Sequence, residues 1–194
     1  MTYITETFDV VTFDQAKHVV LSTDPKNPKK FERETTFLVD KIQNQISIDE
    51  NIVVLDFGCG MGRVSRELIN RFNCKVIGVD ISPSMLMFAT LYTANTKKFV
   101  GTDSFTTPNS ADIAISIFCL QHTENPQKEI DNIISVLKMN GVFVLLNDKK
   151  RLIPTDIDKE GYVIWEDDGF NVFDYVETKL KKIASVPYIN EDCE

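Results

Sequence analysis

The chain has too few cysteines, and has them too far apart, for a disulfide framework or a structural zinc site. Its 194 residues include four cysteines, none of which forms a C-x-x-C pair: Cys59, Cys74, Cys119 and Cys193. Small secreted scaffolds and zinc sites need closely or regularly spaced cysteines. We therefore expect free or buried thiols and no metal.

Excess positive charge and long apolar runs are also missing. There are 21 lysines and arginines against 29 aspartates and glutamates, a formal net charge of −8, so we expect no nucleic-acid partner. No stretch approaches the roughly 18 apolar residues that a membrane helix needs. The start, MTYITETFDVVTFDQAKHVV, lacks the basic and apolar regions of a signal peptide. The sequence predicts a cytoplasmic protein without a membrane partner.

The apolar content and the length of the chain are those of one folded domain. Hydrophobic residues make up 43% of the chain and aromatic residues 10%, a composition that excludes wholesale disorder. A length of 194 residues fits a single domain over residues 1–194 with a substantial core.

From residue 52 onward, apolar runs alternate with segments of helical periodicity. Near-continuous apolar strands separated by helices indicate a parallel sheet covered on both faces. The fold class is therefore α/β, a doubly wound and mostly parallel sheet. Strands are expected at residues 52–57, 75–80, 97–101, 111–118 and 142–147. Helices are expected at residues 62–72, from Ser82-Pro83 onward, and from Asn125-Pro126 to Asn140-Gly141.

The two ends of the chain carry weaker patterns. A break rich in proline, lysine and asparagine precedes a helix expected around residues 35–46. Residues 162–165 form the one strand candidate near the C-terminus. Residues 172–184 fit a helix or a strand equally well, and periodicity does not decide between them.

The stretch VVLDFGCGMGR, residues 53–63, concentrates glycine directly after a buried strand. Glycines at 58, 60 and 62 let the backbone come close to a ligand. In open α/β sheets, ligands bind beyond the carboxyl ends of the strands, where this loop is expected to lie. We therefore interpret it as a ligand-binding loop.

The pattern does not fit a dinucleotide. The fingerprint for that ligand is G-x-G-x-x-G, but here the third glycine comes one position early and Arg63 takes its place. Asp56 would also face a pyrophosphate, and two like charges about 4 Å apart cost roughly 4 kcal/mol at an effective dielectric constant of 20. The loop is therefore predicted to hold a nucleoside that carries positive charge.

VVLDFGCGMGR resembles motif I of the class I S-adenosylmethionine-dependent methyltransferases. VIGVDIS, GTDSF, ADIAISIFCLQHTENP and ISVLKMNGVFVLL resemble later motifs of this family in the same order, so the likeness covers residues 50–147. Met139-Asn140 departs from it, because many relatives carry Pro-Gly in this turn. The resemblance implies a Rossmann-like methyltransferase fold in strand order 3-2-1-4-5, with an antiparallel hairpin beyond the fifth strand. It also implies S-adenosylmethionine as cofactor and S-adenosylhomocysteine as product.

The resemblance assigns roles to individual residues. Asp80 is expected to accept hydrogen bonds from both ribose hydroxyls, Ile81 to cover an adenine face, and Asp56 to face the methionine ammonium. Arg63 either approaches the methionine carboxylate or solvates the start of a helix, and Arg33 is a second candidate for that carboxylate. The full set of expected cofactor contacts is Asp56, Gly58, Cys59, Gly60, Arg63, Asp80, Ile81, Asp103, Ser104, Phe118 and Cys119.

His122 is the candidate catalytic residue. The fourth-strand motif places it at the mouth of the site, where it acts either as a general base or as a packing or capping residue. His18 has no motif support. Positioning alone can contribute roughly 7–11 kcal/mol to such a transfer, so the reaction does not require a strong base.

The predicted function is methyl transfer from S-adenosylmethionine to a small-molecule acceptor. The charge disfavours nucleic acid, and CLQH stands where amino-methylating enzymes carry N-P-P-[YF]. A protein acceptor, other chemistry on the same cofactor such as aminopropyl transfer, and a non-catalytic binding module remain open. We expect residues 1–50 to form a lid or acceptor segment, residues 51–147 the cofactor-binding core, and residues 148–194 the sheet edge and acceptor side.

Overall fold

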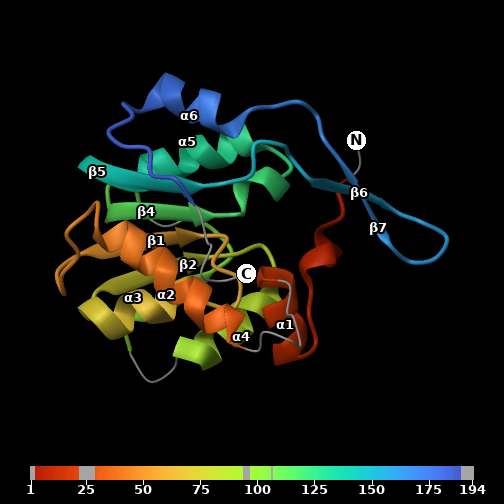
Figure 1. The fold of residues 1–194 in the computed structure, drawn as a ribbon, viewed down its shortest axis with the longest axis horizontal. Coiled ribbons are helices and arrows are strands. Elements are labelled where there is room, and N and C mark those ends of the chain that lie inside the picture. The colour runs from red at the N-terminus through yellow and green to blue at the C-terminus, as the bar shows by residue number, and fades with distance from the viewer. Residues whose placement is uncertain (1–2, 22–28, 94–96, 106, 189–194) are drawn as a thin grey trace.

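A five-stranded parallel sheet forms the centre of the computed structural model, which describes residues 3–21, 29–93, 97–105 and 107–188. The strand order is β3-β2-β1-β4-β5, and each neighbouring pair runs parallel. The predicted 3-2-1-4-5 topology is therefore confirmed (Figure 1). The strands are β1 (Val53–Phe57), β2 (Lys75–Val79), β3 (Phe99–Thr102), β4 (Ala111–Ile117) and β5 (Leu137–Leu146).

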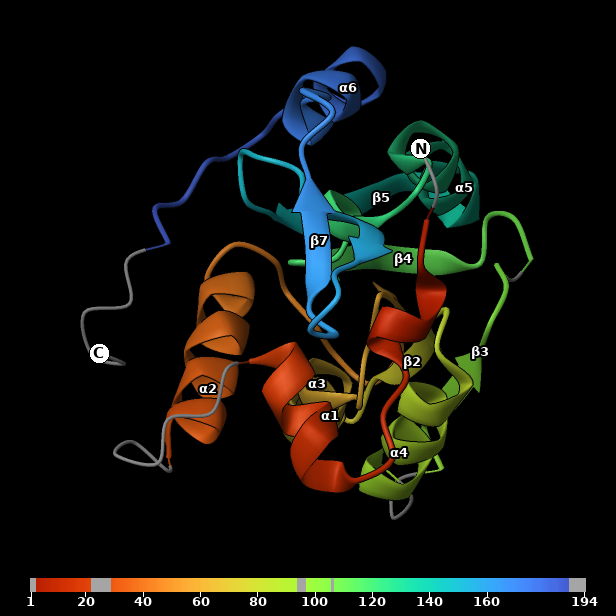
Figure 2. The same ribbon diagram turned by 90° about the vertical axis from the view of Figure 1, so that its right-hand side faces the viewer.

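Helices cover both faces of the sheet, and each face has its own apolar core. One core joins α2 and α3 to β1, β2 and β4, and the other joins α5 and α6 to the opposite face of the sheet. Figure 2 shows α2 and α5 on opposite sides of the strands. The helices around the sheet are α2 (Lys30–Gln43), α3 (Arg63–Phe72), α4 (Pro83–Thr93), α5 (Pro126–Val136) and α6 (Val172–Lys179).

The end of α5 corrects one expectation. Asn125 caps the helix start, because its side chain accepts a hydrogen bond from the Lys128 amide, and Pro126 follows as predicted. The helix, however, ends at Val136 and not at Asn140-Gly141. Leu137 already pairs with Ala111, and a register shift in the β4–β5 ladder accommodates the residues that look like a helix-terminating turn.

The expected antiparallel hairpin is present after β5, but it forms a sheet of its own. β6 (Ile153–Ile157), which the sequence did not reveal, pairs with β7 (Val163–Glu166) as a separate two-stranded sheet. The hairpin projects from the body, and α6 lies next to α5 (Figures 1 and 2). The ambiguous stretch at residues 172–184 thus contains a helix, which is held to α5 by the Tyr175–Asp131 hydrogen bond and the Lys179–Asp131 ion pair.

The N-terminal part folds onto the carboxyl edge of the sheet. It contains the short 3-10 helix η1 (Thr5–Phe8) and the helix α1 (Phe13–Val20). A reciprocal capping box between Thr12 and Gln15 starts α1, so this helix had a sequence signal. Across the described residues, no helix is both long and apolar enough to cross a bilayer.

Candidate cofactor and active site

The glycine loop between β1 and α3 is tightly enclosed. Gly58 and Gly60 have φ angles of 72° and 52°, in the left-handed region that favours glycine. A Cβ on Gly58 would collide with the Cys119 side chain, and one on Gly60 would lie 2.8 Å from Val20 Cγ2. The loop therefore needs glycine both for its conformation and for the close approach of α1 and of the turn that follows β4 (Ala111–Ile117).

Asp80 connects this loop to the start of α4. Its Oδ2 accepts a hydrogen bond from the Gly60 amide at 2.8 Å, and its Oδ1 accepts one from the Ser82 amide at 3.0 Å. Burial raises the pKa of Asp80, and the backbone amides oppose that rise. A carboxylate oxygen can accept more than one hydrogen bond, so both oxygens retain acceptor capacity for a diol.

Asp56 is a second buried carboxyl group under the same loop. It is 3% exposed, and the Ser65 hydroxyl of α3 donates a 2.6 Å hydrogen bond to its Oδ2. Burial raises the pKa of Asp56 to about 6, the Ser65 hydrogen bond opposes this, and the nearby Asp80 carboxylate adds to it. A cation bound beside the loop would favour the ionised form of both groups.

Arg63 does not solvate the start of α3, which was one of its two expected roles. It is 4% exposed, and its guanidinium contacts Glu34 Oε1 at 3.5 Å and Thr35 Oγ1 at 3.3 Å. The ring of Phe31 lies beneath it, with the guanidinium carbon 5.8 Å from the ring centroid. Glu34 was missed from the sequence, although its spacing from Phe31 and Leu38 places it on the apolar face of α2.

The mouth of the site follows β4. Phe118 has a φ of 51°, which is uncommon for a non-glycine residue, and its amide donates to the Leu146 carbonyl. Cys119 follows it against Gly58, and the 3-10 helix η2 (Leu120–His122) comes next. The structure therefore brings the predicted Cys119 to the glycine loop, whereas the ring of Phe118 packs against Tyr188 at a centroid distance of 5.9 Å.

Both ring nitrogens of His122 are engaged by the chain. Nδ1 lies 2.7 Å from the Leu152 carbonyl, which only accepts, so we assign the proton to Nδ1. Nε2 then accepts from the Gln121 side-chain amide at 3.2 Å. Burial lowers the pKa of His122, and its ring packs against Phe8 and Trp165 at centroid distances of 6.2 and 5.3 Å.

The remaining predicted residues fall into two groups. Cys59 is a buried free thiol within the loop, whereas Ile81 is 54% exposed beside Asp80. Asp103 and Ser104 are exposed just beyond β3, and Arg33 is exposed on α2. Cys74 and Cys119 are also free thiols, and Cys193 lies outside the described residues.

The N-terminal segment is held over the loop by polar contacts. The Val10 amide donates to Ser84 Oγ at 2.9 Å, and the Ser82 hydroxyl donates to Asp9 Oδ1 at 2.8 Å. With Val20 against Gly60, these contacts cover the glycine loop and the start of α4. This is the position that the expected lid would take; residues 22–28 and 1–2 of the same segment lie outside the described part.

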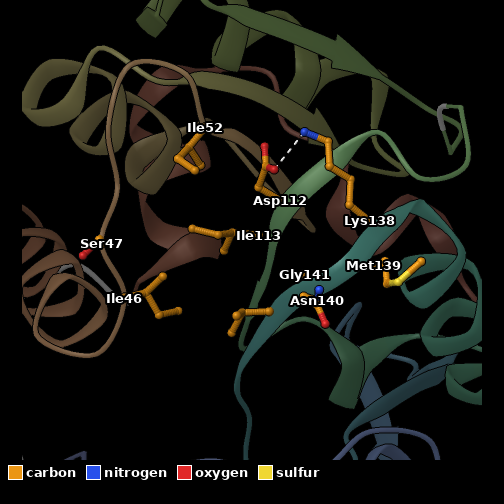
Figure 3. Close-up of a pocket in the computed structure, with 10 residues that line it drawn as sticks. Ile46, Ser47, Ile52, Asp112, Ile113, Lys138, Met139, Asn140 and Gly141 are labelled. Atoms are coloured by element: carbon orange, nitrogen blue, oxygen red, sulfur yellow. Dashed lines mark hydrogen bonds and ion pairs between the residues drawn. The ribbon is translucent and has the colours of Figure 1, made fainter.

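A separate cavity of about 220 Å³ lies at the opposite edge of the sheet (Figure 3). Its lining comes from the starts of β1, β4 and β5, including Ile52 and Ile113. Lys138 and Asp112 form a 2.8 Å ion pair there. Because the glycine loop follows the carboxyl end of β1, this cavity is not the predicted cofactor site.

Comparison with known proteins identifies the class. Residues 55–145 match the family described as "Methyltransferase domain". Together with the fold, this match confirms the resemblance seen in the sequence. Residues 55–145 are therefore a methyltransferase domain, and its fold is that of the class I S-adenosylmethionine-dependent methyltransferases that the sequence resembles.

Individual relatives are distant. The chain is 30% identical to the sterol 4-C-methyltransferase strm-1 of Caenorhabditis elegans over 68% of this chain and 41% of that protein. A solved structure described as an S-adenosyl-L-methionine-dependent methyltransferase of Methanococcus maripaludis has a TM-score of 0.61 and 20% identity, covering 75% of this chain and 66% of that one. Geranyl diphosphate C-methyltransferase from Streptomyces coelicolor, solved with S-adenosyl-L-homocysteine, has a TM-score of 0.53 and 15% identity, covering 64% and 49%. The chain spans 41% to 64% of the length of the curated relatives it matches.

The buried Arg63–Glu34 pair generates a stability prediction. We expect Glu34→Ala to lower the free energy of unfolding by about 3–5 kcal/mol, because it leaves a buried guanidinium without its carboxylate. Urea denaturation followed by circular dichroism measures this change. The control is Glu32→Ala on the same helix, where an exposed carboxylate lies 3.9 Å from Lys17 and contributes about 0–1 kcal/mol. Equal losses in the two variants would contradict the buried-pair interpretation.

Asp56 generates a prediction about pH. Its pKa is about 6 in the folded chain against an ordinary value of 3.8, so the folded state holds an extra proton between these values. Stability from Asp56 is therefore present at low pH and lost as the pH rises through about 6. Relative to the non-titrating Asp56→Asn variant, the wild type should lose roughly 3 kcal/mol between about pH 4 and pH 7. Urea denaturation of both proteins across this range provides the test, and a pH-independent difference would refute the assignment.

Proposed function

We propose that this chain binds S-adenosylmethionine and transfers its methyl group to a small-molecule acceptor. The observation that carries the proposal is the Asp80 carboxylate, whose two oxygens bridge the Gly60 and Ser82 amides at the ligand-binding edge of the sheet. Bound there, S-adenosylmethionine would supply an activated, electrophilic methyl group on a positively charged sulfur.

The residues of the site fit this cofactor. Asp80 would accept hydrogen bonds from the ribose hydroxyls. The glycines would support the site indirectly, because they allow the left-handed loop conformation and the close approach of Cys119 and Val20. Asp56 would face the methionine ammonium, which would favour its ionised form. Ile81, Asp103 and Ser104 extend this surface to where the adenine is expected.

The chain's own part in the reaction is to bind, orient and exclude water. The carboxyl end of β4, with Phe118 and Cys119, would border the methyl group, and the N-terminal segment would cover it. A neutral His122 fits the lowered pKa of its ring. Its two hydrogen bonds to the chain support the packing role over that of general base. We therefore propose that acceptor orientation dominates the catalysis.

The net charge of the chain and the name of one relative support the proposal of a small-molecule acceptor. A net charge of −8 disfavours nucleic acid, and the Caenorhabditis elegans relative is named for a sterol.

Calorimetric titration with S-adenosylmethionine and S-adenosylhomocysteine, followed by product analysis with candidate acceptors, tests the function. Formation of S-adenosylhomocysteine together with a methylated acceptor supports the proposal. Formation of methylthioadenosine would indicate aminopropyl transfer, and binding without turnover would indicate a non-catalytic module.

Asp80 generates the prediction for cofactor affinity. We expect Asp80→Ala to weaken binding of S-adenosylhomocysteine by about 2–5 kcal/mol, because it removes a buried acceptor of charge-assisted hydrogen bonds. Isothermal titration calorimetry measures the loss. The control, Asp131→Ala, removes an exposed carboxylate on α5 that pairs with Lys179 and should leave the affinity unchanged. Unaltered affinity in a folded Asp80→Ala protein would show that the ribose assignment is wrong.

A further inference from the structure

The loop after β5 holds the turn after β4 by its main-chain carbonyls. Arg151 donates from Nη1 to the Leu120 carbonyl at 3.3 Å and from Nη2 to the Thr123 carbonyl at 2.7 Å. Between them, the Gln121 carbonyl accepts from the Leu152 amide at 3.0 Å. Three carbonyls of one short turn are thus fixed by two consecutive residues.

Arg151 is an unusual residue to find at this position. It is 1% exposed. Arginine is seldom fully buried, and where it is buried its charge needs partners. Its Nε lies 3.0 Å from Asp168 Oδ1, and its guanidinium carbon lies 5.9 Å from the centroid of the Phe170 ring. One carboxylate and two carbonyl oxygens therefore compensate the charge of Arg151. Through these contacts Arg151 connects the turn after β4 to the loop after β7.

The same turn is held from the end of β5. The Gln121 amide donates to Asn147 Oδ1 at 3.0 Å, and its side-chain amide donates to Asp148 Oδ2 at 3.0 Å. The Asp148 amide donates back to Gln121 Oε1 at 2.6 Å. Since the Gln121 side chain also donates to His122 Nε2, the orientation of the imidazole depends on the placement of this turn.

The turn lies next to the expected methyl group. It begins directly after Cys119, which packs against Gly58 of the cofactor loop. A small shift of residues 120–123 would therefore move His122 and the acceptor wall relative to the cofactor. A misplacement of about 1 Å can cost a transfer reaction about 10²-fold in rate.

We propose that Arg151 is the positioning residue of the acceptor side, and that it fixes the turn at residues 120–123 and, through it, the orientation and tautomer of His122. The importance of this for catalysis rests on the proposed methyl transfer. The effect on His122 does not, because it follows from contacts within the chain.

Lysine cannot replace Arg151 in this role. The planar guanidinium reaches two carbonyls and one carboxylate at once, in fixed directions. A lysine ammonium carries the same charge on a single nitrogen and cannot span both carbonyls. Arg151→Lys therefore separates the charge from the geometry, and Arg151→Met removes both while retaining the apolar stem.

The test uses the whole chain labelled with ¹⁵N. His18 and His122 are its two histidines, so ring ¹⁵N spectra resolve the tautomer of each. In the wild type we expect His122 to carry its proton on Nδ1. In Arg151→Met and Arg151→Lys we expect a mixture of tautomers, while S-adenosylhomocysteine binds within about threefold of the wild-type affinity.

The His122 pKa adds a second readout. Burial has the largest effect and lowers this pKa. The hydrogen bond to the Leu152 carbonyl and the charge of Asp148 raise it, and the Arg151 charge lowers it. It should therefore rise in Arg151→Met and stay nearer the wild-type value in Arg151→Lys, where a positive charge remains. A matched control, Arg71→Met, removes ion pairs with Asp40 and Glu67 at the far end of α3 and should change neither readout.

Folded Arg151 variants that keep the wild-type tautomer would overturn the proposal. Failure of both variants to fold would overturn it too, because Arg151 would then determine the fold and not the site. Once an acceptor has been identified, we expect Arg151→Met to lower the rate of methyl transfer about 10²-fold. Absence of turnover in the wild type would instead contradict the proposed function, and the His122 spectra would still decide the role of Arg151.

Discussion

The close approach of the glycine loop to its neighbours is the constraint on which the site depends. Gly58 allows the close approach of Cys119 from the turn after β4, and Gly60 allows that of Val20 from α1, so three segments meet where a single Cβ would separate them. The Gly60 amide also donates to Asp80, which fixes the end of β2 against the same loop. Because these contacts share one backbone turn, the carboxyl ends of β1, β2 and β4 are held in one arrangement relative to each other.

The convergence of these segments brings two carboxyl groups, Asp56 and Asp80, close together. The structure compensates their charges only in part. Asp56 is buried, and the half-buried Asp80 lies close enough that its charge raises the pKa of Asp56. The Ser65 hydroxyl and backbone amides stabilise their charged forms, and Arg63, although paired with Glu34, also lowers the pKa of Asp56. Burial still leaves the pKa of both groups raised, so a positively charged ligand beside the loop would stabilise their charged forms. This is the physical reason why the sequence pattern supports the proposed cofactor, which carries a sulfonium and an ammonium group.

The sequence predicted those parts that depend on local patterns. Continuous apolar runs identified the five parallel strands, and the spacing of glycines from Asp56 identified the loop. It could not predict the buried partners, because Glu34 lies 29 positions from Arg63 and Arg151 lies 28 to 31 positions from its carbonyl acceptors. An isolated arginine in a sequence is more often exposed than buried. The predicted end of α5 was wrong for a related reason. Asn140-Gly141 has the composition that usually ends a helix, but here it lies in β5, where the pairing with β4 shifts register.

The two halves of the site are built differently, which bears on how each responds to change. The proposed cofactor half consists mainly of residues 56–82, where short connections join neighbouring elements. The acceptor half joins residues that are distant in sequence: Phe8 and Trp165 pack on His122, and Arg151 links its turn to Asp168. The N-terminal segment contacts both halves, because Phe8 packs on His122 and Val20 lies against Gly60. The hairpin contacts His122 through Trp165, so we expect substitutions in the hairpin to alter acceptor geometry while Asp80 and the glycine loop remain intact.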